Sequence, residues 1–229
     1  MPVLFLAVAH RGASAYEPEN TLRAIRRALE LGANAVEVDV RVTKDRRLAV
    51  IHDETLDRTT SGSGKVREYT LAELKELDAG MGERIPSLEE ALEEARGCLL
   101  VVELKDPDAV GELASSLSGR RGVIAVSFHH NAIRELSRLL DIELGVIFSC
   151  RPVHPAKLAQ DAGATLLLPK HTYVDRELVR EAHREGLRVV AWTVDSPTRM
   201  RELMEMGVDG IASNKPDLLV REARALGLL

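Results

Sequence analysis

Short apolar runs alternate with amphipathic segments along nearly the whole chain, and no other feature of the sequence constrains the fold as strongly. The apolar runs have the length of strands and lie at 4–9, 35–40, 47–52, 98–104, 122–128, 144–148, 164–168, 187–194 and 208–212. Helical patterns fall between them, near 20–31, 87–96, 109–118, 130–139, 153–162, 175–185, 197–205 and 215–226. Strands that alternate with helices form right-handed βαβ units and a parallel sheet buried on both faces. About eight such units close a (β/α)8 barrel, the TIM barrel.

The alternative to a barrel is an open, doubly wound sheet. That fold expects a glycine-rich phosphate-binding stretch after the first strand, and H-R-G-A-S-A-Y at 10–16 is not one. The barrel is therefore the predicted architecture. Capping signals agree with the helices: Asn20 is the predicted N-cap of the first helix, Gly32 lies just past its end, and Ser87 with Glu90 predicts a capping box.

Residues 53–86 interrupt the alternation. The segment is too long for an ordinary strand-to-helix loop, and its pattern is too structured for a linker. S-G-S-G at 61–64 predicts a tight turn, and T-L-A-E-L-K-E-L at 70–77 predicts a short capped helix. We expect a single barrel domain over 1–229 that carries this segment as a small insertion after the second strand.

Composition narrows the choice of partner and compartment. The 229 residues carry a formal net charge of −5 with acids and bases interleaved, which argues against nucleic acid or an anionic membrane as the main partner. The apolar start is too short for a membrane segment and has no basic region before it. Cys98 and Cys150 lie beside apolar runs with no metal-type spacing, so we expect buried free thiols in a reducing compartment. These features predict a cytoplasmic protein without stable membrane insertion, and they leave the oligomeric state open.

The stretch A-V-E-V-D-V at 35–40 places valines on one face of a strand and Glu37 and Asp39 on the other. An edge strand with a solvated acidic face is one interpretation, but the second of eight barrel strands has no open edge. If both acids face the interior they repel, unless a cation lies between them or one stays protonated. Glu103, in the next parallel strand, adds a third carboxylate. Three hard oxygen donors suit Mg²⁺ or Ca²⁺ rather than zinc.

Basic and aromatic side chains follow the same strands. His10 ends the first strand and His52 ends the extension of the second, so the pair can flank one reacting centre as acid and base. Arg11 and Lys105 are either countercharges to the acids or ligands of a phosphate group. Trp192 packs in the core or forms a wall for an apolar part of a substrate.

The assembled motifs resemble one family, the glycerophosphodiester phosphodiesterases. The matching stretches run in the family's order and cover the chain from end to end: H-R-G-A-S-A-Y-E-P-E-N-T-L (10–22), E-V-D-V (37–40), H-D-E-T-L-D-R-T-T-S-G-S-G-K-V (52–66), T-L-A-E-L-K-E-L-D-A-G (70–80), I-P-S-L-E-E-A-L (85–92), V-E-L-K (102–105) and G-V-D-G-I-A-S-N-K-P (207–216).

The resemblance implies a (β/α)8 barrel with an insertion after the second strand. It implies that one divalent cation, Mg²⁺ or Ca²⁺, is held by Glu37, Asp39 and Glu103. It further implies catalytic and substrate-binding roles for the remaining residues, with His10 and His52 as acid and base, Arg11 and Lys105 on the phosphate, and Trp192 on the glycerol side.

The sequence departs from the family's pattern in two places. Ser213 and Asn214 stand where Thr-Asp is common, and His129 stands where an acid commonly follows the S-F pair at 127–128. Neither change touches the predicted metal or acid/base residues, so both bear on substrate details rather than on the chemistry.

The implied activity is hydrolysis of a small-molecule glycerophosphodiester to glycerol 3-phosphate and an alcohol, a step of glycerol and lipid metabolism. The attacking group is either the neighbouring glycerol hydroxyl, which gives a cyclic phosphate, or water. A lysophospholipase D-like or phosphoinositide-type phospholipase is the alternative enzyme, and an apolar rim on the insertion would favour it. A non-catalytic phosphate-binding barrel is the alternative from another class, and it would tolerate the loss of a histidine.

Overall fold

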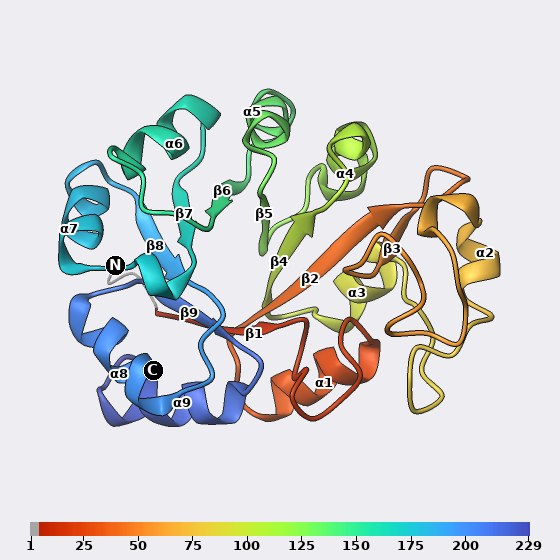
Figure 1. Ribbon diagram of the computed structural model, residues 1–229, viewed down its shortest axis with the longest axis horizontal. Coiled ribbons are helices and arrows are strands. Elements are labelled where there is room, and N and C mark those ends of the chain that lie inside the picture. The colour runs from red at the N-terminus through yellow and green to blue at the C-terminus, as the bar shows by residue number, and fades with distance from the viewer. Residues whose placement is uncertain (1–4) are drawn as a thin grey trace.

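Eight parallel strands close into a barrel in the computed structural model, which describes residues 5–229 (Figure 1). Neighbouring strands follow the order of the chain, and the last pairs with the first. The strands are β1 Leu6–His10, β2 Ala35–Val42, β4 Leu99–Leu104, β5 Val123–Ser127, β6 Glu143–Phe148, β7 Leu166–Pro169, β8 Arg188–Ala191 and β9 Gly210–Ser213. The predicted TIM barrel is confirmed.

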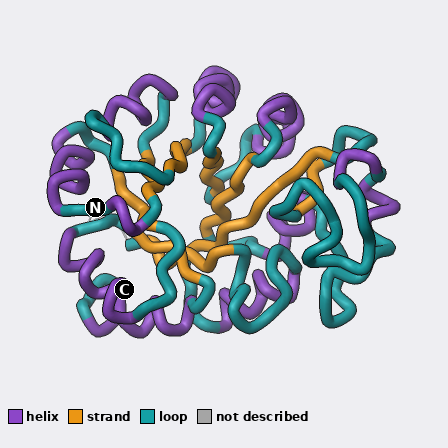
Figure 2. Tube along the Cα trace, viewed as in Figure 1, coloured by secondary structure: helices purple, strands orange, loops and turns teal. Residues whose placement is uncertain are grey.

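Helices surround this ring of strands, as the tube view in Figure 2 shows. They are α1 Leu22–Glu30, α3 Leu88–Glu94, α4 Val110–Leu117, α5 His130–Leu139, α6 Pro155–Ala162, α7 Arg176–Arg184, α8 Pro197–Met206 and α9 Pro216–Ala225. Short 3₁₀ turns at Pro107–Ala109 and His171–Tyr173 precede α4 and α7. Across residues 5–229, no helix combines the length and the apolar character needed to span a bilayer.

Each barrel strand contributes to two separate cores. Outward-facing side chains, including Val36, Val38 and Val40 of β2, join the large apolar layer between strands and helices. Inward-facing side chains form a second cluster on the barrel axis. Because side chains alternate along a strand, the other face of β2 turns Glu37 and Asp39 toward the axis, where both are buried.

The segment between β2 and α3 folds beside the barrel (Figure 1). Its first strand, β3 Leu48–Val50, pairs antiparallel with the end of β2 and therefore lies outside the closed ring. A 3₁₀ turn at Val66–Glu68 and helix α2 Leu71–Leu74 follow. These elements enclose their own apolar cluster, made of Ala49, Ile51, Leu56, Val66, Leu71, Leu74, Ala79 and Ile85.

The helix signals in the sequence are mostly confirmed. The capping box at Ser87 forms, with Glu90 N–H donating to the serine hydroxyl and the Glu90 side chain accepting from Ser87 N–H. Gly32 follows α1 with a positive φ of 87°, a conformation that glycine adopts without strain. The predicted N-cap of α1 is wrong by one residue, because Thr21 caps the helix while Asn20 turns its side chain inward to Asp39.

Two further expectations need correction or restriction. The predicted first strand, 4–9, begins outside the described residues at position 4, and the described strand runs from Leu6 to His10. Both cysteines are free thiols, but only Cys98 is partly buried, whereas Cys150 is exposed. The apolar run before Cys150 ends two residues earlier, at Phe148, so the chain has already turned toward solvent.

Gly210 of β9 lies where the barrel leaves no room for a side chain. A Cβ at this position would come within 2.7 Å of Leu6 Cβ and 2.8 Å of the Leu6 carbonyl oxygen.

We expect Gly210→Ala to lower the free energy of unfolding by about 1–3 kcal/mol, the usual cost of overpacking. Gly111→Ala is the matched control, because Gly111 lies in α4 and, beyond its chain neighbours and the backbone of its own helix, no described atom lies within 4 Å of the added Cβ. It should be neutral or stabilise by up to about 1 kcal/mol. Urea unfolding of both variants tests this, and equal midpoints would contradict it.

Candidate active site

The register of three neighbouring strands brings the acidic residues together. The pairing of β1 with β2 sets His10 opposite Glu37, and the pairing of β2 with β4 sets Asp39 opposite Glu103. One carboxylate oxygen from each of Glu37, Asp39 and Glu103 lies within 4.8 Å of the others, and all three residues are buried. Three acids from two strands therefore converge at one point of the barrel mouth.

Two basic side chains compensate part of this charge. Lys105 Nζ lies 2.5 Å from Glu103 Oε1 and 3.0 Å from Asp39 Oδ1. Arg11 Nε lies 3.1 Å from Asp39 Oδ2, and the Arg11 backbone N–H donates to Glu37 Oε2 at 2.9 Å. Two positively charged side chains thus face three carboxylates, so the cluster keeps an excess of negative charge when all three acids are ionised.

Glu37 also has an oxygen without any partner. Within residues 5–229, Glu37 Oε1 is inaccessible to solvent and accepts no hydrogen bond. Leaving such an atom unpaired is unfavourable. Hard carboxylate oxygens are the ligands that Mg²⁺ and Ca²⁺ prefer. The donor set, the excess charge and the unpaired oxygen therefore fit a divalent cation held by Glu37, Asp39 and Glu103.

The pKa values of the three acids reflect the same imbalance. Burial, and then repulsion from Asp39, raise the pKa of Glu37 well above its usual value. The same two causes raise the pKa of Glu103 to about 7. Burial alone would also raise the pKa of Asp39, but Lys105 and Arg11 hold it below its usual value. The cluster stabilises one ionised acid well and favours protons on the other two.

Asp39 lies behind the others and is held by the loop after β1. It is completely buried, and Asn20 Nδ2 donates to Asp39 Oδ2 at 2.9 Å while the Asp39 backbone N–H donates to Asn20 Oδ1 at 3.1 Å. Asn20 adopts a left-handed backbone conformation with φ of 60° to reach it. These two hydrogen bonds fix the carboxylate in place.

The two histidines stand at the edge of the acidic cluster with different partners. His10 Nδ1 lies 2.7 Å from Asn214 Oδ1, and burial followed by the nearby Arg11 lowers the pKa of His10. His52 Nδ1 lies 2.6 Å from Asp53 Oδ1, and burial lowers the pKa of His52 although Asp39 opposes the shift. Both rings are therefore biased toward the neutral form.

A line of ion pairs connects the loop of His52 to the loop after β1. Arg58 donates to Asp53 at 2.6 Å and to Glu19 at 2.9 Å, and Glu19 also accepts from Arg11 at 2.9 Å. The inserted segment and the β1–α1 loop are tied together through these four charged side chains. His52 is thereby held toward the cluster, although it comes from outside the barrel.

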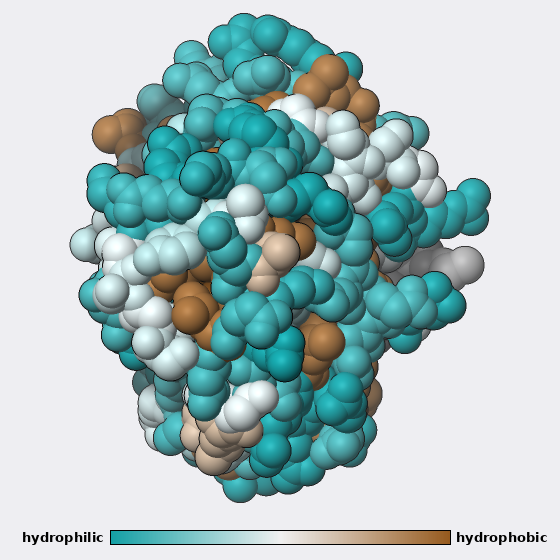
Figure 3. Space-filling view, turned by 90° about the vertical axis from the view of Figure 1, so that its right-hand side faces the viewer, coloured by the Kyte–Doolittle hydropathy of each residue, from teal (hydrophilic) through white to brown (hydrophobic). Residues whose placement is uncertain are grey.

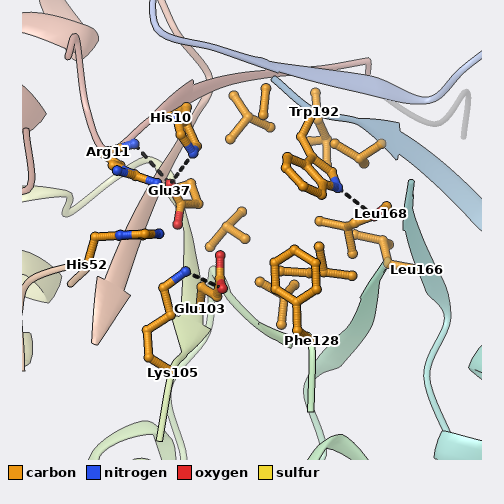
Figure 4. Close-up of a pocket in the computed structure, with 17 residues that line it drawn as sticks. His10, Arg11, Glu37, His52, Glu103, Lys105, Phe128, Leu166, Leu168 and Trp192 are labelled. Atoms are coloured by element: carbon orange, nitrogen blue, oxygen red, sulfur yellow. Dashed lines mark hydrogen bonds and ion pairs between the residues drawn. The ribbon is translucent and has the colours of Figure 1, made fainter. Parts of the chain in front are cut away.

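The residues line one pocket with two unlike halves (Figure 4). The charged half comes from β1 to β4 and the inserted segment, and it contains His10, Arg11, Glu37, His52, Glu103 and Lys105. The opposite half is apolar and comes mostly from the later strands. Its residues are Leu6, Val8, Val101, Val126, Phe128, Ile147, Leu166, Leu168, Val190, Trp192 and Ala212. A ligand in this pocket therefore meets charge on one side and an apolar wall on the other.

Two aromatic side chains belong to the apolar half, Phe128 and Trp192. Trp192 Nε1 donates to the Leu168 carbonyl oxygen at 2.7 Å, which fixes the ring. Phe128 packs edge to face against it, with ring centroids 5.5 Å apart and planes at 87°. Phe128 is 44% exposed, so this wall opens to solvent.

The structure brings every predicted site residue to this mouth, with Asp39 set behind the surface of the pocket. The expectation that position 214 does not touch the acid/base residues is wrong, because Asn214 Oδ1 lies 2.7 Å from His10 Nδ1. The partners missed from the sequence alone are Glu19, Asp53, Arg58, Phe128 and Asp195. Glu19, Asp53 and Arg58 lie inside the motifs that carry the family resemblance, so a closer look at charge complementarity between those motifs could have paired them.

Comparison with known proteins gives one consistent result. Residues 10–218 match the sequence profile of the glycerophosphoryl diester phosphodiesterase family. A glycerophosphodiester phosphodiesterase of Caldanaerobacter subterraneus subsp. tengcongensis is 38% identical over 97% of this chain and 99% of its own length. The enzyme of the same name from Bacillus altitudinis is 35% identical over 93% of this chain and 96% of its own.

Solved structures agree with the sequence relatives. An Oleispira antarctica phosphodiesterase in complex with the product sn-glycerol-3-phosphate superposes with a TM-score of 0.91 at 28% identity, over 96% of this chain and 97% of that one. The glycerophosphodiester phosphodiesterase of Thermotoga maritima gives 0.84 at 27% identity, over 94% and 97%. The similarity spans the whole barrel and the inserted segment.

Removal of divalent cations should destabilise the protein. The three carboxylates then repel across the short distances given above, and the unpaired Glu37 oxygen stays unsatisfied. We expect the melting temperature to fall with EDTA and to recover when Mg²⁺ or Ca²⁺ is added in excess, as ligand linkage requires. Glu37→Gln should lose most of the recovery. A melting temperature that does not respond to either treatment would contradict the cation site.

The raised pKa of Glu103 predicts a pH dependence in chelated protein. The unfolded carboxyl group loses its proton near its usual pKa of 4.5, whereas the folded one keeps it to about 7. Folding therefore binds a proton in this window, and the contribution of Glu103 to stability falls as pH rises from 4.5 to 7. Glu103→Gln removes the titration, so the variant should gain on the order of 3 kcal/mol relative to wild type between pH 5 and 8. The free energy of unfolding of both proteins is measured as a function of pH. A constant difference between variant and wild type across this range would refute the raised pKa of Glu103.

Proposed function

The chain belongs to the glycerophosphoryl diester phosphodiesterase family, and we propose that it hydrolyses glycerophosphodiesters to glycerol 3-phosphate and an alcohol with one divalent cation and a pair of histidines. It is a phosphoric diester hydrolase, a glycerophosphodiester phosphodiesterase. The observation that supports the mechanism best is a single pocket in which His10 and His52 face three clustered carboxylates.

The charged half of the pocket suits a phosphodiester. The substrate carries one negative charge, which repels a nucleophile, and more charge develops on its oxygens in the transition state. Arg11 and Lys105 lie beside the acidic cluster and would bind the non-bridging oxygens. A divalent cation held by Glu37, Asp39 and Glu103 would add Lewis-acid stabilisation of those oxygens. Electrostatic help of this kind contributes several kcal/mol to catalysis.

The two histidines would carry the protons. One ring nitrogen takes the proton of the attacking oxygen while the other ring donates a proton to the departing alkoxide, which is otherwise a poor leaving group. The attacker is the neighbouring glycerol hydroxyl, with a cyclic phosphate as intermediate, or water in a direct displacement. The complex of the Oleispira antarctica neighbour with sn-glycerol-3-phosphate supports glycerol 3-phosphate as the product here.

The apolar half of the pocket bears on whether the substrate is a small glycerophosphodiester or a lipid. The inserted segment was expected to carry an apolar rim if the substrate is a lipid, and the face on its side of the molecule is mostly hydrophilic with small separate apolar spots (Figure 3). The apolar lining comes instead from the barrel itself, mostly from β5 to β9, and it includes Phe128 and Trp192. This wall supports a lysophospholipase D-like activity as the second candidate.

We expect glycerophosphocholine hydrolysis to require both histidines and the cation. His10→Ala and His52→Ala should each lower kcat about 10²–10⁴-fold, the usual contribution of general acid/base catalysis, and Glu37→Ala or EDTA should abolish most activity. His154→Ala is the matched control, because this exposed histidine does not line the pocket. Activity that survives chelation, or either single histidine variant at wild-type rate, would refute the mechanism.

A panel of substrates separates the two candidate activities. We expect glycerophosphoethanolamine and glycerophosphocholine to be hydrolysed, with the appearance of glycerol 3-phosphate followed by ³¹P NMR, which also reveals any cyclic phosphate. Phe128→Ser should lower kcat/KM for lysophosphatidylcholine more than for glycerophosphoethanolamine if the apolar wall binds an acyl chain. Equal effects on both would assign the wall to the glycerol part instead.

A further inference from the structure

The side-chain amide of Asn214, which directly follows the last barrel strand, holds the ring of His10. Its Nδ1 lies 2.7 Å from Asn214 Oδ1, directly after β9, while its Nε2 is turned the other way and lies 4.0 Å from Glu37 Oε2. Figure 4 shows the ring beside Glu37 on the charged side of the pocket. The nitrogen that faces the pocket is therefore Nε2, and the nitrogen that faces the protein is Nδ1.

The orientation of the Asn214 amide is fixed by a carboxylate. Asn214 Nδ2 donates to Asp195 Oδ2 at 2.7 Å, and the Asn214 backbone N–H donates to Asp195 Oδ1 at 2.8 Å. An ionised carboxylate only accepts hydrogen bonds, so the NH₂ group must face Asp195. If the Asn214 amide were rotated by 180°, its oxygen would face the Asp195 carboxylate and be repelled by it, and the charge-assisted hydrogen bond would be lost. The carbonyl oxygen of Asn214 must consequently face His10.

Asp195 is itself well anchored. Its Oδ1 accepts a second hydrogen bond, from Ser213 Oγ at 2.9 Å. The loop that carries Asp195 after β8 is fastened to β9 through Val194 N–H, which donates to the Ala212 carbonyl oxygen at 2.9 Å. The hydrogen bonds thus run without interruption from the backbone of two neighbouring strands to the imidazole ring.

We propose that Asp195 and Asn214 form a positioning pair that fixes the tautomer of His10, with the proton on Nδ1 and a lone pair on Nε2 toward the pocket. An amide oxygen only accepts, so Nδ1 must carry the hydrogen that it donates. Neutral His10 can then only take up a proton at Nε2. This inference rests on the proposed function: in the step in which neutral His10 acts as the base, it accepts the proton at Nε2.

The proton balance of that step is simple. The attacking hydroxyl group or water loses a proton to Nε2 and its oxygen forms the bond to phosphorus. The bond between phosphorus and the departing alcohol oxygen breaks, and that oxygen takes a proton from the other histidine. His10 becomes an imidazolium whose Nδ1–H still donates to Asn214, and its Nε2 proton passes to solvent when the ring returns to neutral. Asn214 does not line the pocket, so neither it nor Asp195 is a catalytic residue.

His52 offers an internal comparison. Its Nδ1 has a carboxylate partner, Asp53, at 2.6 Å. The carboxylate behind His10 is Asp195, and the side-chain amide of Asn214 lies between it and the ring. The two positions, 214 and 195, therefore have complementary donors and acceptors for an exchange of side chains.

The exchange gives the test. Asn214→Leu removes the hydrogen-bond acceptor of His10, and Asn214→Asp places a second carboxylate against Asp195. Each variant should lower kcat about 10–100-fold, the range seen when partners that orient a histidine are lost. KM should change little. The double variant Asn214→Asp/Asp195→Asn restores every donor and acceptor and should return kcat to within about threefold of wild type. No rescue by the double variant, with all variants folded by their melting temperatures, would overturn the proposal.

A spectroscopic readout keeps this inference separate from the proposed function. In protein with ¹⁵N-labelled histidine at about pH 8, the His10 signals, assigned by their loss in His10→Ala, should show a protonated Nδ1 and an unprotonated Nε2. Asn214→Leu should shift them toward the opposite tautomer or a mixture. An unprotonated Nδ1 in wild type would overturn the inference whatever the enzyme hydrolyses, whereas full activity of His10→Ala would overturn the function and leave the tautomer as found.

Discussion

The alternation of side chains along the barrel strands is the constraint on which the rest of the structure depends. With β2 in its observed register, the valines pack against the helices and Glu37 and Asp39 meet Glu103 on the axis. A slip of one residue would exchange the two faces. It would bury two ionised acids in the apolar layer, where nothing compensates their charge. The pattern that selects the register therefore also builds the acidic cluster.

The acidic cluster in turn sets the character of the loops around it. Arg11 and Lys105 approach from the ends of β1 and β4, and Asn20 folds back to hold Asp39. The charged residues come from the first part of the chain, while the second part supplies a wall with almost no polar groups. Most of the charge and most of the apolar surface of the pocket thus come from different halves of one barrel.

The sequence predicts the parts that follow from periodicity and local capping, including the barrel, the inward acids and the capping box at Ser87. It does not distinguish the antiparallel β3 from a barrel strand, because Leu48–Val50 has the same apolar pattern as its parallel neighbours. It misassigns Asn20, because the residue types that cap helices are also those that bind a buried carboxylate. The contact of Asn214 with His10 joins positions 204 residues apart, and only barrel closure brings them together.

The inserted segment has a consequence for how the enzyme loses activity on heating. Its apolar cluster is separate from both barrel cores, and such compact units often open on their own, with less free energy than global unfolding requires. Opening of this unit would withdraw His52 while the barrel and its carboxylates stay intact. Thermal inactivation would then begin as a local event, and heat resistance of catalysis would depend on packing around Leu56 and Leu74 rather than on the barrel that holds most of the chain.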